Sequence, residues 1–594
     1  MDLADLPASP DRSGRRRTLA LGGPLAAALV LWAYAVARTD PADLGGFGLA
    51  GALPLAFWVA LAVLTAGFWV CVRDPLRAHR WPLAYTAGLL LMERATQALV
   101  YPTPLYAWAW KHDAVVDHLL TAGALERGAK LGDMAVYDQW PGFFAAQAAF
   151  TDLTGLEHAA TYMAWWPLLS SLLLLAPLLL IYRTFTQDRR LIWTAVWIFY
   201  AANWVGQDYF SPQSLALFLC LSVLAIVLRR GVRPPAGGRR RALLWTALLI
   251  PLTSALVTAH QLTPVMLAVG LGALCLTRRY RDWAAPAVLL LAFLAWNLTA
   301  SLPFLREAVP EMIRSFGNVT GNLEAGYGTT PTGTGPVLMS WVSRLLSASV
   351  LLLAAYGAWR RPLLRRRATP LLLLAAAPLL MLAANDYGNE MIFRVLLFML
   401  PGASFFAAAA LLPDARPLTA GSPDGKGKPP PVKGLRFGAL PAAALLALAA
   451  AFVPSYAGKD QLSYFPPQEV ALVRQLVDSA PDGSLVVAAS RNYPLAYDTY
   501  WRIGHYWFLD DDRSHVEAIL NDPAATLARD MSGVEPPARG YLLLTRGQIA
   551  YSDMNGMLTA AELHRIETSV AASPLFERVA RNSAGAVYEL RRTS

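Results

Sequence analysis

The sequence predicts an α-helical polytopic membrane protein with about thirteen spans and a small α/β domain at its C-terminal end. The chain of 594 residues is 55% hydrophobic and only 15% charged, whereas a soluble chain usually carries about 25% charged residues. Apolar runs of roughly 20 residues, each long enough to cross a bilayer core, recur up to Phe452. After that position, shorter helix-like and strand-like segments alternate.

Positive charge between the apolar runs predicts the direction of each span. The formal net charge is +10, but the arginines form short tracts at alternate span ends, as the positive-inside rule requires. We therefore attribute the basic character to membrane topology and expect no nucleic acid as a partner. The first apolar run resembles a signal peptide, but with so many runs following it we expect an uncleaved first span. Expected spans include residues 18–37, 53–72, 82–101, 161–182, 284–301 and 437–454, and the others lie between the connections 206–213, 229–241, 259–264, 278–281, 302–335, 360–367, 385–390 and 413–436.

The expected domain organisation follows from these spans. Residues 1–454 would form the transmembrane domain, with 102–160 as its first large extracytoplasmic loop. The Gly- and Pro-rich stretch 413–436 would be a flexible cytoplasmic linker. Residues 455–594 would form an extracytoplasmic α/β domain, in which SLVVAAS, GYLLLT and AVYELRR predict buried strands and PPQEVALVRQLVDS and AAELHRIETSVAAS predict helices.

Polar residues gather at the span ends opposite to the arginine tracts. These ends contain KHDAVVDH, YDQWPGFF, GQDYFSPQ, AHQLTP and NDYGNE, which mix Asp, His, Gln, Asn and Tyr. Polar residues ordinarily lie in loops, but the opposite loops are mostly Arg and Pro. This asymmetry favours a single site assembled from several loops on one face of the membrane.

The segment KHDAVVDH contains the best candidates for a general base. Asp113 and Asp117 are spaced i, i+4, so they would share one face of a helix. A partly desolvated carboxylate has a raised pKa, which suits the removal of a proton from a hydroxyl group. The alternative is an interfacial helix whose charges are solvated.

A divalent metal is a further alternative for this segment, although the sequence requires no cofactor. Two His and two Asp within KHDAVVDH are suitable ligand types, and Asp133 and Asp138 could add oxygen ligands. Their spacing matches no known metal motif, so no metal ligand is assigned.

Charged residues within the expected spans are candidates for function. Glu93, Arg94, Arg344 and Arg394 lie in apolar runs, where a charge costs at least about 2.5 kcal/mol on insertion scales. Arg394 follows Glu390 by one helical turn, so these two could pair with each other. An unpaired arginine near the outer leaflet would instead suit a lipid phosphate.

The segments AWAWKHDAVVDHLL, YDQWPGFF, NWVGQDYFSPQSLALFL, AHQLTP and DYGNEMIFRVLLFMLP resemble those of a group of actinobacterial polytopic glycosyltransferases, over nearly the whole chain. The topology resembles the GT-C superfamily of membrane glycosyltransferases. This resemblance implies a polyprenyl-phosphate sugar as donor, chemistry on the extracytoplasmic side, and an acidic residue of the first large loop as base. Transferred to this sequence, that base is Asp117 or, second, Asp113. The acidic loop follows the third span rather than the first, which departs from the pattern and would make two spans an N-terminal addition.

We therefore expect an inverting glycosyltransferase of the plasma membrane that transfers a sugar to an extracytoplasmic cell-envelope glycan or lipid acceptor. The expected substrate-binding residues are Lys111, His112 and Arg394 at the departing phosphate, Gln207, Asp208, Asn385 and Asp386 around the sugar, and also Asp138, Trp140, Tyr209, His260 and Glu390. Two alternatives remain open from the sequence. One is a polysaccharide polymerase acting on lipid-linked oligosaccharides, and the other is a transporter or flippase for lipid-linked glycans, which would usually show repeat halves.

Overall fold

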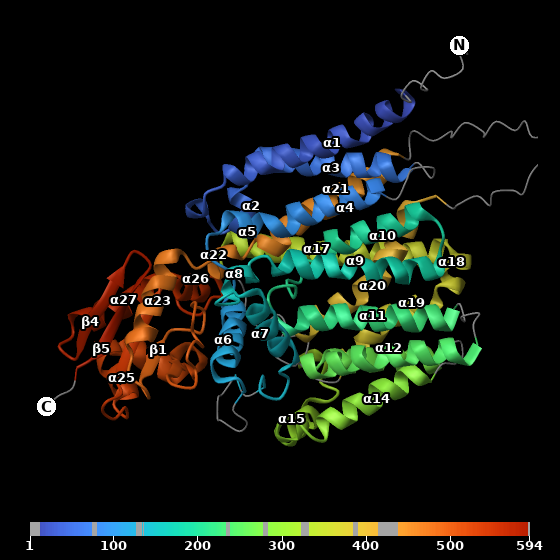
Figure 1. The fold of residues 1–594 in the computed structure, drawn as a ribbon. Helices are drawn as coiled ribbons and strands as arrows, with labels where there is room; N and C mark the ends of the chain where they lie inside the picture. Colours follow the sequence, from blue (N-terminus) through green and yellow to red (C-terminus); the bar gives the residue numbers. More distant parts are fainter. Residues whose placement is uncertain are drawn as a thin grey trace, which may run out of the picture.

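The computed structural model describes residues 12–73, 80–125, 134, 136–232, 238–276, 283–321, 332–383, 390–413 and 438–591. Long helices run side by side in a bundle, and an α/β unit caps one end of it (Figure 1). The helical fold with a small C-terminal sheet is the class that the sequence predicts. The expected cytoplasmic linker lies almost entirely outside the described residues.

Each predicted span for which a range could be given coincides with a helix or with helices in direct succession. The bundle contains α1 (Arg12–Ala37), α3 (Leu55–Arg73), α4 (Arg80–Leu90) continued by the π-helical turn η2 (Leu91–Ala95) and α5 (Thr96–Val100), α9 (Trp166–Phe185), α10 (Arg189–Ala202), α11 (Pro212–Val232), α12 (Gly238–Ala259), α13 (Thr263–Leu276), α14 (Ala284–Asn297), α15 (Leu302–Ser315), α17 (Thr334–Arg360), α18 (Pro362–Arg367), α19 (Thr369–Ala376) continued by η4 (Ala377–Ala383), α20 (Met391–Leu411) and α21 (Ala439–Ala457). Short turns, η1 (Pro41–Asp43) and α2 (Gly48–Ala52), connect α1 to α3.

Within the described residues, seven helices are long and apolar enough to cross a membrane, and eight if α14 and α15, bent by 94°, count as one span. The remaining predicted spans are short helices, helices in direct succession, or, in α12, a helix whose apolar part is limited to Leu243–Ala259. The helix α10 has 14 residues, of which 12 are buried, and it contacts α3, α4, α9, α17, α20 and α21. A helix that is apolar on all sides belongs in the interior, so the apolar run that predicted a span here marks the centre of the bundle.

Close packing between α17 and α20 depends on one glycine. A Cβ atom at Gly357 would lie 2.0 Å from the carbonyl oxygen of Phe406, so only glycine allows the two backbones to approach this closely. Small residues at helix crossings are a usual means of packing membrane helices.

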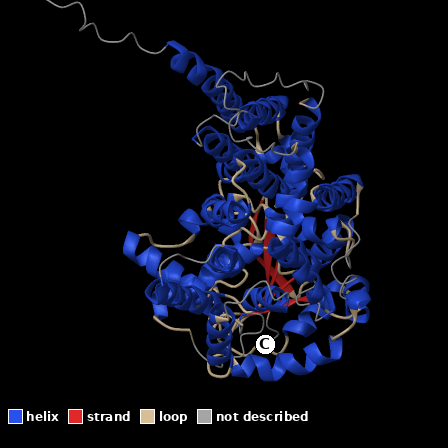
Figure 2. Ribbon diagram, turned by 90° about the vertical axis from the view of Figure 1, so that its right-hand side faces the viewer, coloured by secondary structure: helices blue, strands red, loops and turns tan. Residues whose placement is uncertain are grey.

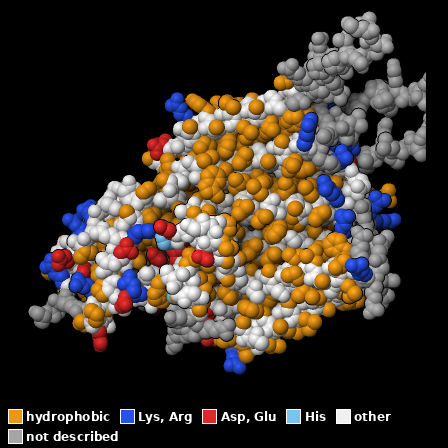
Figure 3. Space-filling model, in the orientation of Figure 1, with side chains coloured by type: hydrophobic (Ala, Val, Ile, Leu, Met, Phe, Trp, Pro, Cys, Tyr) orange, Lys and Arg blue, Asp and Glu red, His pale blue; other side chains and the backbone are white. Residues whose placement is uncertain are grey.

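The outer surface of the bundle is apolar. Figure 3 shows hydrophobic side chains over the visible flank of the helices, with Lys and Arg at the end farthest from the α/β unit and both acidic and basic side chains on that unit. Leucines such as Leu244, Leu291 and Leu352 are 64%, 69% and 71% exposed. An exposed apolar belt with basic residues at one end is the pattern of a membrane-embedded surface.

The C-terminal α/β unit (residues 467–590) contains a five-stranded mixed sheet in the order β2-β1-β3-β5-β4. Strand β1 pairs in parallel with β2 and β3, and β5 pairs antiparallel with β3 and β4. Its elements are α23 (Pro467–Ser479), β1 (Leu485–Ala488), β2 (Gly504–Trp507), η7 (Phe508–Asp510), α24 (Arg513–Asn521), α25 (Pro523–Met531), β3 (Gly540–Thr545), α26 (Arg546–Met554), α27 (Ala560–Ala572), β4 (Phe576–Asn582) and β5 (Gly585–Leu590). The predicted strands are β1, β3 and β5 and the predicted helices are α23 and α27, whereas β2 and β4 were not predicted. Figure 2, which looks along most of the helices, places the sheet behind the middle of the bundle.

Three short helices join the bundle to the α/β unit: α6 (Ala107–Ala122), α7 (Gly142–Thr154) and α8 (Ala160–Met163). They share a hydrophobic core with the unit, which includes Val116, Phe143, Phe465 and Tyr493. Tyr106, just before α6, has a positive φ of 77°, which is rare for a bulky residue. Its N–H donates to the carbonyl oxygen of Ser463 at 2.8 Å, in α22 (Asp460–Ser463). The start of α6 is thus fixed against the segment that leads into the α/β unit.

Candidate active site

A cavity of about 450 Å³ lies at the junction between the bundle and the α/β unit. Its size falls within the range of small-molecule sites, roughly 300–1,000 Å³. Its described lining consists of the aromatic residues Tyr106, Trp108, Tyr137, Trp140 and Tyr209, the cations Lys111, Arg394 and Arg491, the imidazoles His112 and His260, the carboxylate Glu390, the amides Gln207, Gln213 and Gln261, and Val136, Ser211, Pro212 and Ala259.

The cavity brings together many residues that the sequence singled out. Lys111, His112, Trp140, Gln207, Tyr209, His260, Glu390 and Arg394 all line it, although they come from five separate segments of the chain. Among the described residues, Asp138 and Asp208, the other predicted substrate-binding residues, are outside the lining. Asp138 is partly buried beside Tyr137 but is outside the lining, and Asn385 and Asp386 lie outside the described residues.

Lys111 on α6 sits among aromatic rings. Its Nζ is 4.1 Å from the centre of the Trp108 ring, 5.2 Å from Tyr137 and 4.4 Å from Tyr497. The side chain is only 1% exposed. The negative faces of the rings stabilise the ammonium group and hold its charge at the cavity wall.

His112 is neutral and engaged at both ring nitrogens. Its Nδ1–H donates to the carbonyl oxygen of Phe210 at 2.7 Å, so Nε2 accepts from the Tyr137 hydroxyl at 3.1 Å. The ring stacks on Tyr209 with an interplanar angle of 9°. Burial lowers the pKa of His112 to about 3. An uncharged imidazole with both nitrogens engaged orders the lining but adds no charge for a phosphate, which the sequence analysis had expected of it.

Glu390 and Arg394 form an ion pair of 3.3 Å between Oε2 and Nη2. This was one of the two alternatives left open by the sequence. Gln207 Nε2 donates to the same Glu390 oxygen at 3.3 Å. The carboxylate is 37% exposed and the guanidinium 12%. The pair therefore places a carboxylate and a largely buried cation on one wall.

His260 caps the following helix. Its Nδ1 accepts from the N–H groups of Leu262 and Thr263 at 3.3 and 3.2 Å, at the start of α13. Satisfying the N–H groups at a helix start is a structural task, so this side chain both lines the cavity and fixes α13.

Trp140 connects the cavity to the bent pair α14 and α15. Its ring packs edge-on against Phe304 with centroids 5.1 Å apart. The neighbouring Gln139 accepts from Trp296 Nε1 through its backbone oxygen at 3.0 Å and from the Phe304 N–H through its side chain at 3.0 Å. The turn that carries Trp140 is therefore held by both helices.

Asp113 and Asp117 share one side of α6, as their spacing predicts, but neither lines the cavity. Asp117 Oδ2 lies 3.1 Å from His158 Nδ1, and Asp113 is 4% exposed. Burial raises the pKa of Asp113, and the neighbouring carboxylates of Asp117 and Asp498 raise it further. Burial also raises the pKa of Asp117 and of Asp498, with Arg474 opposing the shift. The pair thus belongs to an acidic cluster between α6 and the α/β unit.

Asp208 is directed into the bundle, although its neighbours Gln207 and Tyr209 line the cavity. Its Oδ2 pairs with Arg94 Nε at 2.8 Å, and its Oδ1 accepts from the Tyr456 hydroxyl at 3.0 Å. The expected place of Asp208 beside a sugar is therefore wrong. A guanidinium buried among helices without a carboxylate partner is strongly destabilising, which favours the orientation of Asp208 toward Arg94.

No metal centre is formed by the described part of the chain, in which no group of three or more His, Cys, Asp or Glu side chains is arranged to hold an ion. Asp133, one of the suggested oxygen ligands, lies outside the described residues. The residues present do not fit a metal site.

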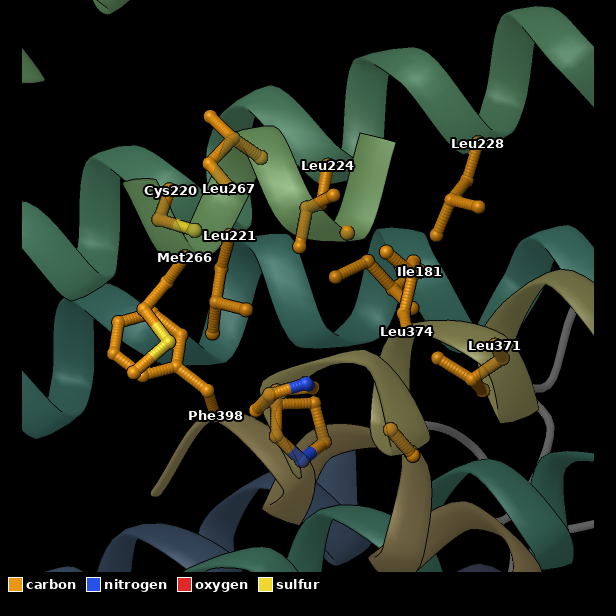
Figure 4. A pocket seen from close by; sticks show the side chains of 15 residues that line it. Ile181, Cys220, Leu221, Leu224, Leu228, Met266, Leu267, Leu371, Leu374 and Phe398 are labelled. Atoms are coloured by element: carbon orange, nitrogen blue, oxygen red, sulfur yellow. The ribbon is translucent and has the colours of Figure 1, made fainter. Parts of the chain in front are cut away.

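A second cavity, between the helices, is apolar and small. It has a volume of about 30 Å³ and is lined by residues such as Ile181, Cys220, Leu224, Leu374 and Phe398 (Figure 4). This space admits only one or two water-sized groups. A long lipid chain does not fit in this cavity.

The sequence analysis missed the contribution of the α/β unit. Arg491 lines the cavity and Tyr497 packs on Lys111, and both follow strand β1. Their position after a predicted strand could have indicated this contribution, because ligands in open sheets with parallel strands bind beyond the carboxyl ends of the strands.

Comparison with known proteins finds weak similarity to solved structures. No family model and no curated protein match the sequence. ArnT from Cupriavidus metallidurans bound to undecaprenyl phosphate has a TM-score of 0.49 and 12% identity, covering 86% of this chain and 98% of that chain. The Archaeoglobus fulgidus oligosaccharyltransferase tethered with an acceptor peptide has a TM-score of 0.46 and 10% identity, covering 89% of this chain and 74% of that chain. Both TM-scores are below 0.5 and both identities are at or below 12%. The likeness assigns neither donor nor acceptor to this chain.

Proposed function

We propose that this chain is a glycosyltransferase of the plasma membrane that moves a sugar from a polyprenyl-phosphate donor to an acceptor hydroxyl on the extracytoplasmic side. The observation that carries the proposal is the lining of the junction cavity, where Lys111, Arg394 and Arg491 surround the same space as Glu390 and five aromatic rings. Guanidinium and ammonium groups bind phosphate oxygens. Aromatic faces suit the apolar faces of a sugar ring, and the cavity opens at the end of an apolar bundle where a lipid donor would be embedded.

The proposed reaction is a single displacement of the phosphate, with inversion at the anomeric carbon. The Glu390 carboxylate takes the proton of the acceptor hydroxyl, and the acceptor oxygen forms a bond to the anomeric carbon. The bond between that carbon and the phosphate oxygen breaks, and the phosphate leaves with the electron pair. Lys111 and Arg394 stabilise the charge that develops on the leaving phosphate, and Trp140 and Tyr209 pack against the sugar.

The ion pair of Glu390 with Arg394 gives the site a way to activate its base. A bound phosphate competes for the Arg394 guanidinium, because phosphate oxygens match its donor geometry. The Glu390 carboxylate, released from its ion pair with Arg394, is then free to accept the proton of a hydroxyl group. Donor binding would thus prepare Glu390 for the acceptor.

The assignment of the base to Asp117 or Asp113 stays a prediction from the resemblance. The geometry favours Glu390, because Glu390 lines the cavity and the two aspartates lie beside His158 and Asp498 outside it.

The test is sugar transfer by the purified full-length protein in proteoliposomes. The donors are tritium-labelled undecaprenyl-phosphate hexoses and pentoses, and the acceptor is a cell-envelope glycan fraction. Transfer by the wild type and its loss in Glu390→Gln and Lys111→Met is the expected result. A folded wild-type protein that transfers no sugar from any such donor would contradict the proposed function.

A further inference from the structure

The carboxyl ends of the parallel strands β1, β2 and β3 face the bundle. Just after β1, Asn492 Nδ2 donates to the carbonyl oxygens of Leu462 and Gly547, each at 2.8 Å. Just after β3, Arg546 Nη1 donates to the carbonyl oxygen of Tyr464 at 3.1 Å. These bonds fix the carboxyl end of the sheet to the segment that follows the last helix of the bundle.

Arg491, three residues after β1, is oriented by two neighbours, one from the last position of β2 and one from η7. Its guanidinium forms an ion pair with Asp510 and lies over the Trp507 ring, 4.8 Å from the centroid. The side chain is 32% exposed and lines the cavity. A guanidinium held by a ring face on one side and a carboxylate on another is pre-organised for a ligand.

Tyr497 connects the same strand end to α6. Its ring lies 4.4 Å from Lys111 Nζ and 5.7 Å from the Trp507 ring. The rings of Trp507 and His505 stack at an angle of 13°. Tyr497 is therefore supported within the α/β unit while it packs on a cation of the bundle side.

We propose that the α/β unit is part of the substrate site: Arg491 binds the phosphate of the donor, and Tyr497 is a positioning residue that holds Lys111 against the same phosphate. This inference rests on the proposed function. Carboxyl ends of parallel strands are the usual place for ligands in open α/β sheets, and here that edge forms a wall of the cavity.

The charge of the cavity favours phosphate as the group that Arg491 binds. The described lining has three cations, Lys111, Arg394 and Arg491, against the single carboxylate of Glu390. Asp510, which pairs with Arg491, offsets a second positive charge, so one positive charge remains. A donor phosphodiester carries one negative charge, so the charge of the site complements that of the donor.

The direct test measures binding of undecaprenyl phosphate to the full-length protein in nanodiscs. Arg491→Gln should weaken binding by about tenfold or more, in line with the loss of a charge-assisted hydrogen bond, and Arg491→Lys should lie between that variant and the wild type. The matched control is Arg539→Gln, which removes an arginine of the same unit that pairs with Glu589 at 2.8 Å and does not line the cavity. Binding by Arg491→Gln with wild-type affinity would overturn the role of Arg491.

Transfer kinetics separate this inference from the proposed function. If the wild type transfers sugar and Arg491→Gln raises the donor KM alone, the inference holds. If Arg491→Gln instead raises only the acceptor KM, Arg491 serves an anionic acceptor and the inference is wrong while the proposed function stands. A wild type that neither binds undecaprenyl phosphate nor transfers sugar would overturn both.

The positioning role of Tyr497 has its own readout. Tyr497→Leu should raise the donor KM severalfold, whereas Tyr497→Phe, which keeps the ring face, should not. Because Tyr497 acts through Lys111, the double variant Lys111→Met/Tyr497→Leu should bind undecaprenyl phosphate in nanodiscs no more weakly than Lys111→Met alone. Additive losses in the double variant would show that Tyr497 does not act through Lys111.

Discussion

The ammonium group of Lys111 lies 4.4 Å from the centre of the Tyr497 ring. Lys111 belongs to the first connection after the third predicted span, and Tyr497 belongs to the C-terminal α/β unit. Two segments far apart in the chain therefore meet at one cation beside the cavity, and the α/β unit contributes Arg491 to the cavity lining.

Glu390→Gln should lower kcat for sugar transfer by about 100-fold or more, because general-base catalysis typically contributes 10²–10⁴-fold. Asp113→Asn and Asp117→Asn should keep most of the activity, since neither side chain lines the cavity. Initial rates with saturating donor and acceptor measure the difference. Full activity in Glu390→Gln, together with loss of activity in either aspartate variant, would show that the base is on α6.

Asp113→Asn should stabilise the protein more at pH 8 than at pH 5. Burial and the adjacent carboxylates raise the pKa of Asp113 in the folded state, so folding is favoured while the group is protonated, and this stability is lost as the pH rises from the ordinary Asp value through the raised one. Each unit of pKa difference corresponds to about 1.4 kcal/mol. Asparagine cannot ionise, so the variant does not lose stability in this way as the pH rises.

Thermal unfolding in detergent at the two pH values measures this effect as a difference in Tm between variant and wild type. The neighbouring charged groups are Asp117, Asp498, Arg474 and His158, and they are unchanged in the comparison. Asp152→Asn, at an exposed position on α7, is the control. Equal Tm shifts at pH 5 and pH 8 would rule out the titration of Asp113 as the cause.

Asp208→Asn should destabilise the protein by about 3–5 kcal/mol, because it leaves the buried Arg94 without its counter-charge. The pair is 2.8 Å apart, with side chains 0% and 8% exposed. The double variant Arg94→Met/Asp208→Asn should recover part of the loss, since no buried cation remains. Urea or thermal unfolding in detergent measures the two variants, and an unchanged Tm in Asp208→Asn would show that the pair contributes little.

Gly357→Ala should destabilise the bundle, whereas Gly272→Ala should not. A Cβ at Gly357 would lie 2.0 Å from the Phe406 oxygen, while Gly272, also within a helix, has no atom within 4 Å of the added carbon. Alanine in an open helical position is favoured over glycine by about 1 kcal/mol. The two variants therefore move the Tm in opposite directions, and a fall of similar size in both would contradict the close approach of α17 and α20.

Hydrophobicity and periodicity predicted much of the fold, because both are local properties of the chain. The apolar runs became the helices of the bundle, and the short apolar segments after Phe452 became β1, β3 and β5. Strands β2 and β4 were missed because their exposed and half-buried residues give no continuous apolar signal. The apolar run at α10 correctly predicted a helix. The position of this helix at the centre of the bundle depends on the six helices that it contacts.

The candidate site was also predictable only in part from local properties of the chain. The polar segments at one end of the spans were recognised from their composition, and eight of the residues chosen from them line one cavity. The direction of each side chain was not predictable. Gln207 and Tyr209 line the cavity, whereas Asp208 between them pairs with Arg94. Successive residues of a turn point in different directions, and only the surrounding helices decide which side meets a buried counter-charge.

The sequence by itself therefore determined the membrane class, the positions of the helices and the segments that could hold a site, since each follows from residues close together in the chain. The tertiary structure alone decided that Lys111 rather than Asp117 lies on the cavity side of α6, that Arg491 joins the cavity lining, and that Tyr497 packs on Lys111. The physical reason is that a helix acquires an inner and an outer face only from the elements packed against it, and the α/β unit that covers α6 comes from the far end of the chain.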